Sequence, residues 1–117
     1  MKAFISKNQS QKLWERCKLI TNYLNFNIVN ECAELKSMSA IKFTDDSTTI
    51  TILEFRLEDY ADCICITIDC QKSNGMDGML CNYPQIETQF IEQLFRRLES
   101  IPKENEFKLQ EHDYVYL

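Results

Sequence analysis

The sequence predicts a two-layer α+β fold, in which an antiparallel meander of about four strands is flanked by an N-terminal helix and a later helix packed on one face. Two segments, residues 9–24 and 84–101, repeat apolar side chains with helical spacing, and the segments between them alternate apolar and polar residues. The 117 residues include only two glycines and two prolines, so no segment is typical of a linker. A chain of this length buries roughly 65% of its unfolded surface without a metal or disulfide. We therefore expect residues 1–117 to form a single α+β domain.

The first helix is expected over residues 9–24, because its apolar side chains recur every three or four positions and form one stripe. That stripe consists of Leu13, Cys17, Ile20 and Leu24. The segment before it, residues 1–6, is either a short leading strand or an arm. After the helix, apolar residues alternate with asparagines, which indicates a first meander strand over residues 26–32.

The next strands are expected to begin at Ala40 and at Thr48, and residues 60–70 form the partner of the latter. Within 60–70, isoleucines occupy every second position and should face the core. In the preceding strand the apolar positions change parity between Ile52 and Leu53. Since a shift of one residue moves every side chain to the other face, we expect a β-bulge there or a strand covered on both faces.

Residues 71–83 hold both glycines and are predicted to form the longest loop, which is where function often resides. Pro84 suits the first turn of the second helix. Its apolar stripe consists of Ile86, Phe90, Leu94 and Leu98. The tail from Phe107 onward alternates again and is a candidate edge strand.

Charge is distributed unevenly along the chain, whose net charge is −5. Residues 1–25 carry five bases and one acid, whereas residues 45–69 carry seven acids and a single base, Arg56. Nucleic acid requires a dense basic patch, so this balance argues against direct nucleic-acid binding and favours a basic protein partner. The candidate partner-binding residues are these acids together with two residues of the adjoining loop: Asp45, Asp46, Glu54, Glu58, Asp59, Asp62, Asp69, Met76 and Asp77.

The six cysteines are expected to be reduced, because the N-terminus lacks the apolar run of a secretory signal and the chain is expected to be cytoplasmic. No segment approaches the ~20 apolar residues of a membrane span. The C-x-x-C pairs typical of structural zinc sites are absent from the sequence, so no metal and no cofactor are predicted. We expect Cys63 and Cys65 to line the second face of the sheet, under a helix.

Catalytic chemistry finds little support in the residues. His112 is the single histidine, and no nucleophile elbow or phosphate-binding glycine loop accompanies it. The acids Asp59, Asp62 and Asp69 remain candidates for a hydrolytic pair or a divalent-cation site. The leading interpretation is therefore a protein without enzymatic activity.

The order of helix, antiparallel strands and helix is shared by RWD domains, secretion-system effector chaperones and some toxin-immunity proteins. The predicted function is a non-enzymatic module that engages a basic protein partner through an acidic hairpin, as an intracellular immunity or inhibitor protein does. The alternatives are a homodimeric effector chaperone, an RWD-like adaptor domain in a larger assembly, and a small cysteine- or carboxylate-dependent enzyme. The oligomeric state stays open between monomer and homodimer.

Overall fold

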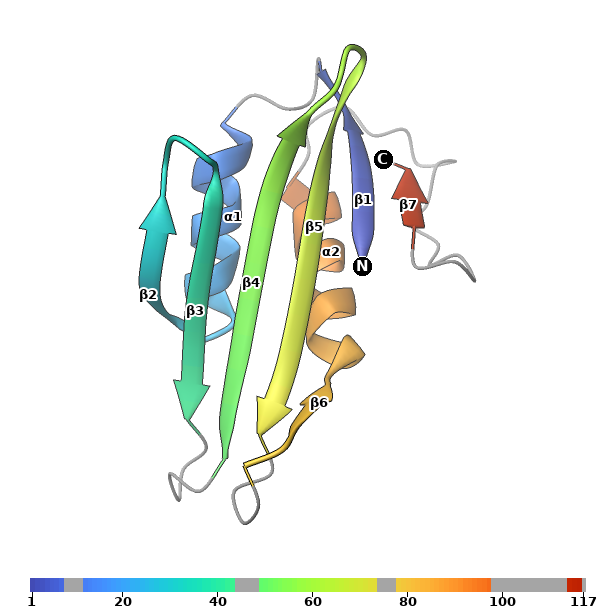
Figure 1. Cartoon of the computed structure of the whole chain (residues 1–117). Helices are drawn as coiled ribbons and strands as arrows, with labels where there is room; N and C mark the ends of the chain where they lie inside the picture. Colours follow the sequence, from blue (N-terminus) through green and yellow to red (C-terminus); the bar gives the residue numbers. More distant parts are fainter. Residues whose placement is uncertain (8–11, 44–48, 74–77, 98–113, 117) are drawn as a thin grey trace.

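The computed structural model describes residues 1–7, 12–43, 49–73, 78–97 and 114–116 (Figure 1). Along the chain the elements are β1 (Lys2–Ser6), α1 (Leu13–Tyr23), β2 (Asn27–Cys32), β3 (Ser37–Phe43), β4 (Ile50–Asp59), β5 (Cys63–Ser73), β6 (Leu80–Asn82), α2 (Pro84–Arg97) and β7 (Tyr114–Tyr116). Among these elements, no helix is both long and apolar enough to cross a membrane.

The described strands form one sheet in the order β2-β3-β4-β5-β1-β7, and β6 pairs with the far end of β5. The run from β2 to β5 is an antiparallel meander, which confirms the predicted fold class. The N-terminal segment is a strand and not a free arm, since β1 pairs antiparallel with β5 and its Ala3 and Ile5 are fully buried. β7 pairs parallel with β1.

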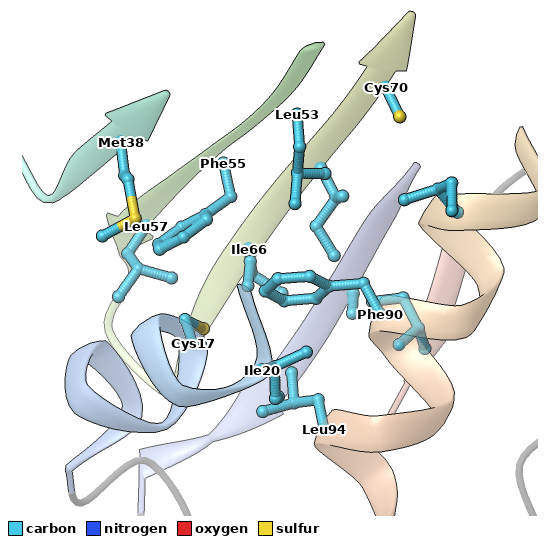
Figure 2. Close-up of a cluster of buried hydrophobic side chains, with 14 of the residues drawn as sticks. Cys17, Ile20, Met38, Leu53, Phe55, Leu57, Ile66, Cys70, Phe90 and Leu94 are labelled. Carbon is cyan, nitrogen blue, oxygen red and sulfur yellow. The ribbon is translucent and has the colours of Figure 1, made fainter. Parts of the chain in front are cut away.

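Both helices pack against the same face of the sheet and lie behind it in Figure 1. The predicted inward isoleucines of β5 are confirmed, because Ile66 and Ile68 have no exposed surface. Phe55, in the middle of β4, holds the two helices to the sheet (Figure 2). Its ring centroid lies 5.6 Å from that of Trp14 on α1 and 5.6 Å from that of Phe90 on α2.

The α-ammonium of Met1 fastens the second helix to the sheet. It donates hydrogen bonds to the carbonyl oxygen of Ile68 at 2.8 Å and to Oε1 of Glu87 at 2.9 Å. Only 8% of Glu87 is exposed, so this ion pair lies largely out of water. A buried carboxylate is tolerated because it is paired, and β1, β5 and α2 are thereby joined at one point.

The predicted bulge at Ile52–Leu53 is wrong. β4 pairs without interruption with β3 on one side and β5 on the other, and the register shift in the meander falls instead in β2, between Ile28 and Asn30. The alternative, a strand covered on both faces, is also wrong among the described elements, since both helices lie on one side. The apolar pattern changes parity because Ile50 and Ile52 lie on the side of the sheet that the helices leave uncovered.

Several predicted boundaries also move. The second meander strand begins at Ser37, three residues before Ala40, because the connection is completed by Lys36 in the left-handed region at φ 49°. The loop predicted over 71–83 is shortened, since β5 continues to Ser73 and β6 pairs with it. The predicted helix end, residues 98–101, lies outside the described residues.

Candidate functional site

The sheet has one face that no described helix covers, here called the open face. Alternation along each strand places on it the side chains opposite in parity to the core, and the register aligns them in rows across the sheet. Its central members are Ser37, Ser39 and Ile41 of β3, Ile52, Glu54, Arg56 and Glu58 of β4, and Cys63, Cys65, Thr67 and Asp69 of β5. Figure 1 looks onto this face.

The middle of the open face is hollowed. The hollow has a volume of about 340 Å³ and is lined by polar side chains of β3, β4 and β5. These include Ser39, Glu54, Arg56, Thr67 and Asp69. The floor is therefore a polar surface, shaped to receive a protruding group and able to hydrogen-bond with it.

Two carboxylates stand side by side in this hollow. Glu54 and Asp69 are directly opposite each other in the register of β4 and β5. The base nearest in sequence, Arg56, points its guanidinium to Glu58 instead, with Nη2 2.9 Å from Oε1. Within the described residues neither Glu54 nor Asp69 has a basic partner. Like charges in this arrangement oppose folding, so the pair is a candidate binding site for a cation.

The tip of the β4–β5 hairpin, at the upper end of the sheet in Figure 1, is acidic as well, but less than the sequence suggests. Asp59 and Asp62 are both exposed there, and the Nζ of Lys7 forms an ion pair with Asp59. Tyr60 donates a hydrogen bond to Oε2 of Glu58 at 3.4 Å, and the Glu58 carboxylate raises the pKa of the Tyr60 phenol. A count of charges over residues 45–69 does not include Lys7, because this residue follows β1, which joins the sheet from the start of the chain.

The predicted site residues thus fall into three groups. Glu54, Glu58 and Asp69 share the open face, and Asp59 and Asp62 mark the hairpin tip. The third group lies outside the described residues and consists of Asp45, Asp46, Met76 and Asp77. The single histidine, His112, also lies outside them. Glu58 and Asp59 both belong to β4, and the turn of the hairpin consists of residues 60–62.

The other end of the open face is apolar, which the sequence reasoning missed. Ile41 and Ile52 are directly opposite, as are Phe43 and Ile50, and Leu80 continues the surface from β6. Phe43 is 53% and Leu80 49% exposed. The signal for this surface is the change of parity at Ile52, which alone predicts a bulge or a strand covered on both faces. The open face therefore combines an acidic hollow with an apolar end.

The cysteines belong to no group of three or more potential metal ligands within the described residues. All six are free thiols. Cys63 and Cys65 line the second face as predicted, but the expectation of a helix above them is wrong, since no described helix covers that face. Burial raises the pKa of Cys70 to about 12 and that of Cys17 further, so these two thiols remain protonated at neutral pH.

The three acids considered for catalysis do not converge. Asp69 is opposite Glu54, whereas Asp59 is opposite Ile64, five positions farther along β4. Five residues of strand span roughly 17 Å. The described part of the chain holds no group of three or more His, Cys, Asp or Glu side chains that could bind a metal ion.

Comparison with protein-family models finds none that matches the chain, and comparison with curated proteins finds no significant match.

Proposed function

We propose that the protein acts by stoichiometric, non-covalent binding of a basic protein partner in the cytoplasm, without catalytic turnover. The observation that carries the proposal is the pair of carboxylates, Glu54 and Asp69, which lie side by side in the hollow of the open face and have no basic partner among the described residues. A Lys or Arg of the partner that enters the hollow satisfies both carboxylates at once.

The dimensions of the open face suit a protein partner. The five adjacent strands from β2 to β1 hold 39 residues, each of which occupies about 3.3 Å along its strand and about 4.8 Å across the sheet. The resulting area, roughly 600 Å², approaches the ~800 Å² that each partner contributes to an interface of standard size. Small-molecule sites are enclosed clefts, and this surface is broad and shallow by comparison.

The distribution of polarity describes the partner further. The apolar end around Ile52 and Phe43 favours an aliphatic or aromatic anchor on the partner, because buried apolar contacts carry most of the energy of such interfaces. The acidic hollow and hairpin tip favour basic residues beside that anchor, which steer association and set its orientation. An inhibitor of a basic toxin or nuclease has this kind of partner.

A homodimer that pairs two open faces is disfavoured by the same charges. When the two-fold axis passes through the hollow, Glu54 and Asp69 approach the same acids of the second protomer. An adaptor that contacts its assembly through the helices leaves the uncovered carboxylates without a role. An inhibitor that binds a different protein is therefore the function that we prefer among the candidates.

The test is capture of partners from the source cell, followed by mass spectrometry. The wild-type protein is compared with Glu54→Lys/Asp69→Lys and with a control, Glu15→Lys/Glu34→Lys, which makes the same charge change at exposed positions away from the open face. We expect the wild type and the control to retain one basic protein at one-to-one stoichiometry and the open-face variant to lose it. Equal retention of that protein by both variants at low salt rules out the open face as its binding surface.

A further inference from the structure

A second hollow lies on the opposite side of the sheet, at the end far from the hairpin tip. It has a volume of about 200 Å³ and lies between the ends of β3, β4 and β5 and the start of α2. Two lysines and a threonine line it, together with the rings of Phe26, Phe43 and Tyr83 and the side chain of Ile86 on the first turn of α2. Its polar lining is thus cationic, in a chain whose net charge is −5.

The lysines belong to one row of the sheet. Lys42 of β3 is directly opposite Thr51 of β4, and Thr51 is directly opposite Lys72 of β5. Residues in one row point to the same face, and two strand spacings separate the outer members by about 10 Å. Thr51 is only 7% exposed. An anion seated above Thr51 is therefore within reach of both flexible lysine side chains.

Each ammonium is held by an aromatic ring. The Nζ of Lys42 lies 5.7 Å from the centroid of Phe26 and donates a hydrogen bond of 3.3 Å to the carbonyl oxygen of Leu24. The Nζ of Lys72 lies 5.1 Å from the centroid of Tyr83. Such contacts position a cation without neutralising it.

Neither lysine has a carboxylate partner within the described residues, unlike Lys7 and Lys18, which pair with acids. The acid on the first turn of α2 does not neutralise them, since Glu87 pairs with the α-ammonium of Met1. Two like charges in one row repel each other, and an anion between them removes that repulsion.

We propose that the row Lys42–Thr51–Lys72 is a binding site for a small organic anion, a phosphate monoester or carboxylate joined to a flat apolar body. The two ammonium groups and the Thr51 hydroxyl bind the anionic head, and the rings with Ile86 contact the apolar body. The volume equals that of about seven water molecules and lies below the 300–1,000 Å³ of drug-sized pockets, so the ligand is the size of a single ring with its anionic group. The site is on the helix-covered side of the sheet, and Phe43 at the end of β3 lines it as well as the apolar end of the open face.

The test is a titration of the isotopically labelled protein, followed by NMR, with phenyl phosphate, benzoate and inorganic phosphate at constant ionic strength. The variant Lys42→Met/Lys72→Met removes both charges, and Lys18→Met/Lys36→Met is its control, because Lys36 also lies over a ring, that of Trp14, at 5.9 Å. Thr51→Val is a milder variant that keeps the shape of the hollow.

We expect saturable shifts confined to the row in the wild type and the control, with millimolar affinity typical of a ligand of this size. Phenyl phosphate or benzoate should bind more tightly than inorganic phosphate. Whichever of the two aromatic anions binds more tightly shows whether the site prefers a phosphate or a carboxylate. Loss of both lysines should weaken binding on the order of tenfold or more, and Thr51→Val should weaken it less. The proposal is overturned if none of the three anions gives saturable shifts in the wild type, or if the two double variants bind equally well. The lysines then only cover the end of the core.

Discussion

Removal of one charge from the open face should stabilise the isolated protein. Glu54 and Asp69 are directly opposite on β4 and β5, where side chains start about 5 Å apart. At that distance in water, two unit charges repel by about 0.8 kcal/mol, within the range of about 0.2–1 kcal/mol for cross-strand pairs. Asp69→Asn keeps the size of the side chain and removes its charge. We therefore expect the free energy of unfolding in urea to rise by about 0.5–1 kcal/mol at low salt, and Tm by roughly 2–5 °C.

The control for this prediction is Glu34→Gln, which makes the same change of net charge at an exposed carboxylate in the turn between β2 and β3. Glu34→Gln should change stability by less than about 0.3 kcal/mol. At 1 M salt, where the Debye length is about 3 Å, the gain from Asp69→Asn should largely disappear. If Asp69→Asn destabilises the fold, or gains no more than Glu34→Gln, then the carboxylates are satisfied within the chain and are not held ready for a partner.

Three further predictions concern the fold. Phe55→Ala should lower the free energy of unfolding by about 3–5 kcal/mol, because it opens a cavity between both helices and the sheet; a urea titration that shows a loss below about 1 kcal/mol contradicts this. Glu87→Gln leaves the Met1 ammonium buried without a counter-charge and should cost about 3 kcal/mol, and an unchanged Tm would show that the ion pair adds nothing. The unfolded chain ionises its thiols above pH ~8.5, whereas burial raises the pKa of Cys70 to about 12 and that of Cys17 further, so stability should fall as pH rises from about 8.5 towards 12. Replacing both cysteines with alanine should flatten that slope, and a slope that stays the same assigns the alkaline loss to other groups.

The fold class was predictable because local periodicity and burial agree along most of the chain. The stripe through Cys17 and Ile20 and the alternating isoleucines of β5 indicate helix and strand without reference to distant segments. The pairing of β1 with β5 joins residues more than 50 positions apart, and alternation over five residues cannot specify such a partner. β6 was hidden for a similar reason, since its three residues carry no pattern of their own.

The candidate site was only partly predictable. Counting acids over residues 45–69 selected Glu54, Glu58 and Asp69, and the structure places these three on one face. The count missed Lys7, which follows β1 directly and pairs with Asp59, because neutralisation depends on tertiary neighbours. The row of Lys42 and Lys72 was missed for the same reason, since only the register of three strands aligns residues 30 positions apart.

The proposed partner-binding face is tested most directly by the association rate of the captured partner, measured in rapid mixing at increasing salt. The wild-type rate should fall at least about tenfold between low and high ionic strength, as electrostatic steering requires. Glu54→Lys/Asp69→Lys should already associate slowly at low salt, and Glu15→Lys/Glu34→Lys should retain most of the wild-type rate. An association rate that is independent of salt in the wild type, and equal in the two variants, would contradict binding of a basic partner through the open face.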